Sequence, residues 1–164
     1  MITREEIEDL YEWAKVTEFP LYKLNNPAHY TDGKRVDYSW QKLVTHKNKT
    51  LIRKKNMTER ICQIHENSDI LWSAIGVFYG GTVVNAHKDP DIFNEGYKRI
   101  QIPLKIPDKE KCYMVWEDGE KIFWEEGEPQ VHYVMDYFHE GHNYSDESMI
   151  FLMLDIRKSA EVKL

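Results

Sequence analysis

The feature that most constrains the fold of this chain is a series of short segments, from residue 70 onward, that are rich in β-branched and aromatic residues. Such residues favour strands, and glycine, proline and Asp-Gly pairs separate the segments. Asp118-Gly119 is typical of a hairpin turn. Several short strands at regular spacing predict an antiparallel sandwich or jelly roll. The expected strands cover residues 71–78, 82–86, 99–106, 112–116, 121–124, 130–134 and 149–156.

The N-terminal part of the chain follows a different pattern. Thr3 and Glu6 form a capping-box pair, and apolar residues then recur at helical spacing, which predicts a helix over about residues 4–17. A second short helix is expected over residues 58–66. Between them the chain is polar, and the apolar positions in residues 40–44 indicate one short amphipathic element. We therefore expect a mostly β protein with N-terminal helices.

Composition limits the class of protein. A chain of 164 residues that is 41% hydrophobic fits one domain, with a helical or irregular part at 1–69 and a jelly-roll core at 70–157. A net charge of −6 argues against a nucleic-acid backbone or an anionic membrane as the main partner. Cys62 and Cys112, without CxxC spacing, fit free thiols in a reduced compartment. With no secretory signal and no membrane-length apolar run, the expected location is cytoplasmic.

One tripeptide has the residue types and spacing of a metal site. His87 and Asp89 follow the apolar run Val83-Val84, and alternate side chains of a strand point to the same face. A second apolar segment carries His139. Two imidazoles and one carboxylate leave open positions on a metal, which is typical of non-haem Fe(II) oxygenases. By spacing alone, however, a surface His-Asp pair in a turn before Pro90 is the more frequent interpretation.

Four ordered blocks around these residues are more specific than the tripeptide. In order and spacing they resemble the aspartyl/asparaginyl β-hydroxylase family of Fe(II)/2-oxoglutarate-dependent oxygenases, over about residues 77–156, and the N-terminal part carries none of the resemblance. The resemblance implies a double-stranded β-helix, a cupin-like jelly roll. It also implies Fe(II), O₂ and the cosubstrate 2-oxoglutarate. The blocks are residues 79–90, 99–107, 124–128 and 139–155.

The same resemblance implies His87, Asp89 and His139 as the metal ligands. The family motif around the distal histidine reads His-Glu-x-x-Asn, which residues 139–143 match, so we expect His142 to have a packing role. Some animal members lack a carboxylate at the position of Asp89. Its presence here also argues against a halogenase, because in those enzymes a halide ion takes that place.

The residues for the cosubstrate depart from the family pattern. Relatives open their last strand with an arginine that binds the distal carboxylate of 2-oxoglutarate, whereas this chain has Met149. The resemblance implies that Arg99 and Gln101 lie near the cosubstrate, and the sheet period places Lys105 on the same side. Either Arg99 or another cation binds the carboxylate, or the cosubstrate is altered, or the site is impaired. Without the resemblance, Arg99 is interpreted as a solvated charge at a strand end.

We therefore expect an Fe(II)/2-oxoglutarate-dependent dioxygenase that hydroxylates an amino-acid or peptidyl side chain or another small substrate. An alternative from a different class is a cupin-like metal-binding or small-molecule-binding module without 2-oxoglutarate turnover, which Met149 favours. A further alternative keeps the three ligands in a metalloenzyme that does not use 2-oxoglutarate. The sequence names neither the substrate nor the oligomeric state.

Overall fold

The computed structural model describes residues 1–18, 22–24, 38–45 and 56–164, and the second and third of these ranges are described by their backbone. Within the described ranges the chain forms two helices and twelve strands. The elements outside the central barrel are β1 (Ile2–Thr3), α1 (Arg4–Val16), β2 (Tyr22–Leu24), β3 (Tyr38–Thr45), α2 (Glu59–His65) and β12 (Val162–Lys163).

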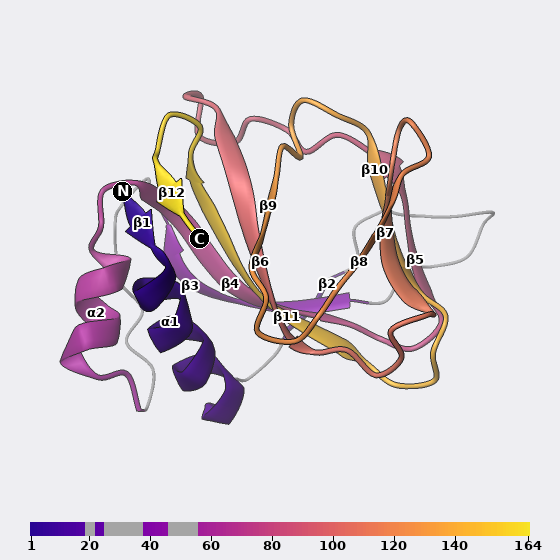
Figure 1. The fold of residues 1–164 in the computed structure, drawn as a ribbon, viewed down its shortest axis with the longest axis horizontal. Helices are drawn as coiled ribbons and strands as arrows, with labels where there is room; N and C mark the ends of the chain where they lie inside the picture. Colours follow the sequence, from indigo (N-terminus) through magenta and orange to yellow (C-terminus); the bar gives the residue numbers. More distant parts are fainter. Residues whose placement is uncertain (19–21, 25–37, 46–55) are drawn as a thin grey trace.

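Ten of the strands form two facing antiparallel sheets, and eight consecutive ones make up the barrel itself (Figure 1). The larger sheet has the order β2-β3-β4-β11-β6-β9, and the smaller one has the order β5-β10-β7-β8. Because the chain crosses repeatedly between the two sheets, they enclose an interior, as expected for a jelly roll. The eight strands are β4 (Ile70–Phe78), β5 (Thr82–His87), β6 (Tyr97–Lys105), β7 (Cys112–Trp116), β8 (Lys121–Phe123), β9 (Gln130–His132), β10 (His139–Asn143) and β11 (Met149–Arg157).

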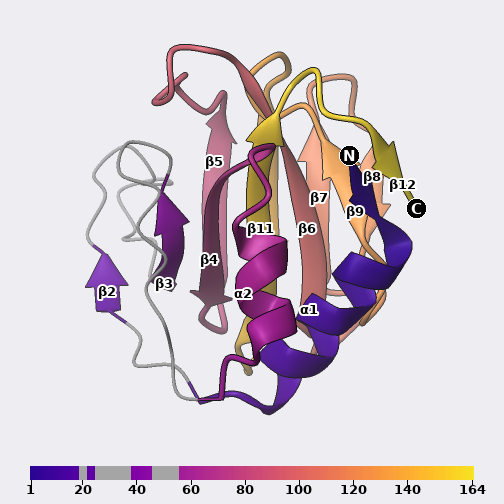
Figure 2. The same ribbon diagram turned by 90° about the vertical axis from the view of Figure 1, so that its left-hand side faces the viewer.

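The two helices cover the outer face of the larger sheet (Figure 2). Apolar residues of α1 and α2, such as Ile7 and Ile64, pack there with Leu152 and Leu154 of β11 in one buried cluster. The predicted capping box at the start of α1 is confirmed, since the Thr3 hydroxyl accepts a hydrogen bond from the backbone of its partner glutamate. Neither helix of the described residues has the length and apolar character needed to span a bilayer.

The side chains of β11 point alternately toward the interior between the sheets and toward the outer layer of helices. Leu152 and Leu154 face the helices, whereas Met149, Phe151 and Met153 face the smaller sheet and form a second buried cluster. Successive side chains of a strand point to opposite faces, so a single strand supplies both clusters. The interior between the sheets is therefore lined by apolar side chains from this central strand.

The structure confirms the predicted strands and helices with small shifts at their ends. The hairpin at Asp118-Gly119 is also confirmed, since β7 and β8 pair antiparallel and Gly119 has a φ of +86°. The amphipathic element expected at residues 40–44 is part of strand β3. Strand β10, which carries His139, is not among the strands expected from β-branched and aromatic residues.

The turn before β5 contains two neighbouring glycines, and each position requires glycine for a different physical reason. A Cβ on Gly80 would lie 2.6 Å from the backbone carbonyl of Asp146, whereas Gly81 has open space but a φ of +74°. We predict that Gly80→Ala lowers the free energy of unfolding by about 2–3 kcal/mol, as overpacking against backbone does. Gly81→Ala should cost about 1 kcal/mol from backbone strain alone. Urea unfolding measures both, and equal losses would contradict the steric account.

Candidate metal centre

The two histidines of the predicted site meet because their strands pair. β5 ends at His87, β10 begins at His139, and the two residues are partners in the antiparallel register. Asp89 lies two residues beyond the end of β5, where its backbone N–H donates to the carbonyl of Val134 at 2.9 Å. The strand pairing thus fixes both imidazoles, and this backbone bond fixes the carboxylate.

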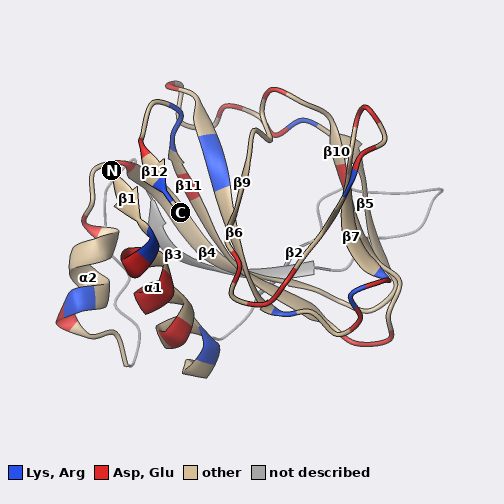
Figure 3. Ribbon diagram, viewed as in Figure 1, with Lys and Arg blue, Asp and Glu red and all other residues tan. Residues whose placement is uncertain are grey.

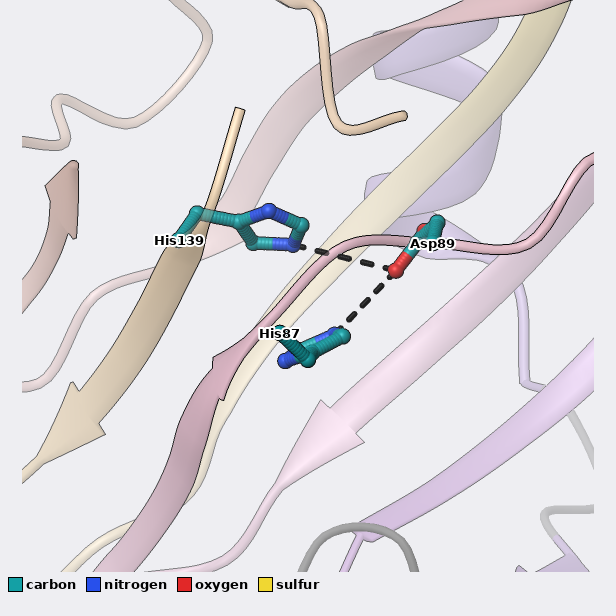
Figure 4. Close-up of side chains that lie close together, drawn as sticks. All are labelled: His87, Asp89 and His139. Atoms are coloured by element: carbon teal, nitrogen blue, oxygen red, sulfur yellow. Dashed lines mark ion pairs between the residues drawn. The ribbon is translucent and has the colours of Figure 1, made fainter. Parts of the chain in front are cut away.

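The three side chains converge on one point (Figure 4). Their potential ligand atoms all lie within 4.8 Å of one another. Oδ1 of Asp89 is 3.1 Å from Nε2 of His87 and 3.8 Å from Nε2 of His139. The structure therefore brings together the three residues that the sequence singled out, in a set of two imidazoles and one carboxylate.

The backbone sets the tautomer of both imidazoles. Nδ1 of His87 lies 2.6 Å from the carbonyl oxygen of Asn85, and Nδ1 of His139 lies 3.3 Å from that of Tyr137. A carbonyl oxygen can only accept, so each Nδ1 carries the hydrogen. In the neutral ring Nε2 then presents a lone pair toward the centre of the three residues, whereas a protonated His87 donates from Nε2 to Oδ1 of Asp89 at 3.1 Å. Three electron-pair donors that converge in this way fit a bound metal cation.

Electrostatics favour the metal-binding protonation states of Asp89 and His139, whereas at His87 the hydrogen bonds to Asp89 and to the backbone of Asn85 outweigh burial and raise the pKa, so a metal would displace a proton there. Burial opposes ionisation of Asp89, but the positive charge of Arg99 and the hydrogen bond with His87 outweigh it and hold the pKa of this carboxyl below its usual range. Burial lowers the pKa of His139 to about 4. An ionised carboxylate and a neutral imidazole are the forms that bind metal near neutral pH.

Arg99 bridges two carboxylates at the back of the site. Its Nε and Nη2 donate to the two oxygens of Asp155 at 2.7 and 3.0 Å, and its Nη1 lies 2.8 Å from Oδ2 of Asp89. Asp155 is only 1% exposed. Arg99 belongs to the positively charged stretch of β6 (Figure 3). It holds one oxygen of Asp89 and leaves the other facing the histidines.

A cavity of about 460 Å³ opens beside the three residues and extends between the sheets. At the metal end its wall includes Asp89 and Arg99. Further in, Gln101 is polar, and its buried Oε1 has no hydrogen-bond partner among the residues described. The other inner walls are apolar, from Met114, Trp124, Met149, Phe151 and Met153.

Two further histidines and a lysine lie near the site but outside the ligand set. On the outer face of β10, His142 pairs through Nε2 with Glu140 and through Nδ1 with the Tyr144 hydroxyl, both at 2.9 Å. His132 is buried on β9 and contacts Trp116, outside the ligand set. The prediction that Lys105 shares the inner face with Arg99 is wrong. The register shifts just before it, so Lys105 pairs with the outward Ile150 and its ammonium binds Glu147 at the surface.

The sequence did not reveal the ion pair between Arg99 and Asp155. A usable signal was present, because Asp155 shares the inward face of β11 with Phe151 and Met153, and a carboxylate on a buried face needs a cation. The prediction that Arg99 and Gln101 bind a cosubstrate stays a prediction.

Comparisons with known proteins identify relatives in sequence and in fold. The sequence model of the aspartyl/asparaginyl β-hydroxylase family matches residues 2–159, so the likeness extends well beyond the blocks recognised from residue 77 onward. No curated protein sequence matches this chain.

Solved structures share the fold at low sequence identity. A 2OG-Fe(II) oxygenase family protein from Burkholderia pseudomallei is 11% identical with a TM-score of 0.63, over 92% of this chain and 78% of that one. A cupin-like protein from Thermotoga maritima is 13% identical with a TM-score of 0.56, over 87% and 82%. A predicted oxalate decarboxylase from the same organism is 14% identical with a TM-score of 0.54, over 85% and 94%. The jelly-roll, cupin-like fold predicted from the sequence is confirmed.

The two histidines of β10 provide a matched test of the ligand set. We predict that His139→Ala loses most of its metal after loading and dialysis, because one of three converging ligands is removed. His142→Ala should retain it, because His142 lies on the other face of the strand. Metal content per chain, measured by atomic emission, decides. Equal loss in both variants would place the ligand three residues further along the chain.

Arg99 should influence metal affinity without touching the metal. Lysine cannot reproduce the fork that holds Asp155 and Asp89 together, so Arg99→Lys should weaken Zn(II) binding by about 10- to 100-fold, as is usual when a ligand loses its orienting partner. Lys105→Ala, on the outer face, should bind as tightly as the wild type. Competition with a chromophoric chelator measures both, and unchanged affinity in Arg99→Lys would rule out this orienting role.

Proposed function

Because this chain belongs to the aspartyl/asparaginyl β-hydroxylase family, we propose that it is an Fe(II)-dependent dioxygenase. Its cosubstrates would be O₂ and a 2-oxo acid, for which the family resemblance implies 2-oxoglutarate. The reaction would hydroxylate an amino-acid or peptidyl side chain or another small substrate. The observation that carries the proposal is the convergence of His87, Asp89 and His139 at a cavity between the sheets. The solved relative from Burkholderia, described as a 2OG-Fe(II) oxygenase family protein, supports the same class.

The donor set fits a first-row divalent metal. His87 and His139 would each supply Nε2, and Asp89 would supply Oδ1. Three such ligands on one side of a metal would leave other positions open for exogenous ligands. When bound, Fe(II) supplies the activation of O₂, which amino-acid side chains cannot perform. Zn(II) or Ni(II) binds such sites at least as tightly, so metal availability in the cell decides which ion is bound.

The residues around the ligands orient them. Arg99, which is itself held by Asp155, binds one oxygen of Asp89, and Nδ1 of each imidazole donates to a backbone carbonyl. The indole of Trp116 lies 5.6 Å from the ring of His139, between centroids, and covers its other side. These contacts fix the ligand geometry before the metal arrives, which lowers the reorganisation needed for binding.

Specific observations also favour the other two functions. The cupin-like relative and the apolar Met149 at the inner end of the cavity support a metal-binding or small-molecule-binding module without turnover. The ion pairs of Arg99 use three of its five N–H donors, which supports a metalloenzyme with these ligands that does not depend on 2-oxoglutarate. Turnover measurements separate these functions from the dioxygenase.

We predict that protein loaded with Fe(II) consumes O₂ and releases CO₂ when supplied with a 2-oxo acid, even without a hydroxylatable substrate. Asp89→Ala should lose this activity by about 100-fold or more, because the metal loses its anionic ligand. His142→Ala, on the outer face of β10, serves as the matched control and should behave as the wild type. An oxygen electrode and trapped CO₂ provide the measurements. Stoichiometric metal without O₂ consumption, across a panel of 2-oxo acids, would favour the binding module.

A further inference from the structure

We propose that the 2-oxo acid used at this site carries an apolar side chain in place of the second carboxylate of 2-oxoglutarate. The proposal rests on the proposed function and names the chemical class of its cosubstrate. Branched aliphatic, thioether and aromatic side chains all belong to this class.

The inward face of β11 is charged only at the metal end. Asp155 holds Arg99 there, and the next inward positions are Met153, Phe151 and Met149. At about 3.4 Å per residue, Met149 lies roughly 20 Å along the strand from Asp155. A ligand that extends from the metal into the barrel therefore leaves the charged end and passes along thioether and aromatic groups.

The facing walls have the same character. Met114 from β7 and Trp124, which follows β8, line the cavity opposite β11. The cationic side chains in the described lining, Lys88 and Arg99, both lie at the metal end, next to or bound to Asp89. Deeper in, the polar groups are the amide of Gln101 and the buried indole N–H of Trp124, which has no hydrogen-bond partner among the described residues, and both are uncharged. Among the side chains that the structure describes, none at the inner end would neutralise a second carboxylate.

Desolvation separates the two kinds of 2-oxo acid. Both share the C1 carboxylate and the C2 carbonyl, which would bind at the metal, so they differ only in the side chain that enters the cavity. A carboxylate that enters this apolar region loses its hydration without gaining an ion pair, which is strongly unfavourable. An apolar side chain gains from burial, and flexible methionines adapt to its shape. The second carboxylate of 2-oxoglutarate therefore does not fit the described cavity.

The overall reaction balances with such an acid. For 4-methyl-2-oxopentanoate, the C1–C2 bond breaks, C1 leaves as CO₂, and C2 is oxidised to the carboxyl group of 3-methylbutanoate, with one oxygen atom from O₂. The other oxygen atom enters a C–H bond of the substrate and gives C–OH. The acid and the C–H bond each provide two electrons, which together reduce one O₂.

The first test measures binding rather than turnover. Protein loaded with Fe(II) is titrated without O₂ against 4-methyl-2-oxopentanoate, 2-oxoglutarate and pyruvate, and the visible charge-transfer absorption of the chelate is recorded. We expect the half-saturating concentration of 4-methyl-2-oxopentanoate to be about 100-fold lower than that of 2-oxoglutarate, because burying a carboxylate without a cation costs much free energy. It should also be below that of pyruvate, which lacks the longer side chain.

Two results would overturn the proposal in different ways. Binding of 2-oxoglutarate as tight as, or tighter than, that of 4-methyl-2-oxopentanoate would refute the apolar cosubstrate and leave the proposed dioxygenase intact. A protein that binds Fe(II) but gives no chelate absorption with any of the three acids would refute both. Isothermal calorimetry on the Zn(II)-loaded protein repeats the comparison without a redox-active metal.

A variant that adds the missing cation provides the second test. Met149→Arg should lower the half-saturating concentration of 2-oxoglutarate by about tenfold or more and weaken binding of 4-methyl-2-oxopentanoate, because a buried guanidinium then needs an anion. Met149→Leu, the matched control, should keep the wild-type preference. Thermal unfolding establishes that each variant is folded, and Met114→Arg on the facing wall replaces Met149→Arg if the latter does not fold. An unchanged preference in a folded arginine variant would contradict the proposal.

Discussion

The alternation of side chains across β11 is the constraint on which the rest of the structure depends. Its outward residues, such as Leu152 and Leu154, bury the helices against the larger sheet, while its inward residues line the cavity. A slip of one residue would exchange the two sets and place Asp155 among the apolar side chains under α1. Asp155 would then be buried without its cation, and Arg99 would keep only Asp89. The fold and the candidate metal centre therefore depend on the same register of this strand.

Charge balance explains why the buried ion pairs suit a dication. Two carboxylates, Asp89 and Asp155, share the single positive charge of Arg99, which leaves one negative charge facing two imidazoles. Burial keeps His139 neutral, and His87, whose pKa is raised by its hydrogen bond with Asp89, compensates that charge only by holding a proton that a metal would displace. A divalent metal is then the dominant local charge, and it reverses the cost of bringing Asp89 into a partly buried position.

The sequence predicted most strands because β-branched and aromatic runs were interrupted by turn residues, and it identified the three candidate ligands from their spacing and family context. It missed β10, since residues 139–143 read His-Glu-Gly-His-Asn and show no apolar alternation. That strand exists because β5 and β7 pair with it on both sides, which is a tertiary effect. The position of Lys105 was mispredicted because a bulge after Pro103 breaks the period of two.

The pairing of β5 with β10 also has a consequence for how the chain folds. His87 and Asp89 are close in sequence and offer a weak chelate even in an unfolded chain, whereas His139 joins them only after a long loop has closed. The complete ligand set therefore exists only in the state in which the smaller sheet has formed. A metal ion that binds the complete set would therefore stabilise that state by mass action, and it would link two segments that lie far apart in the sequence.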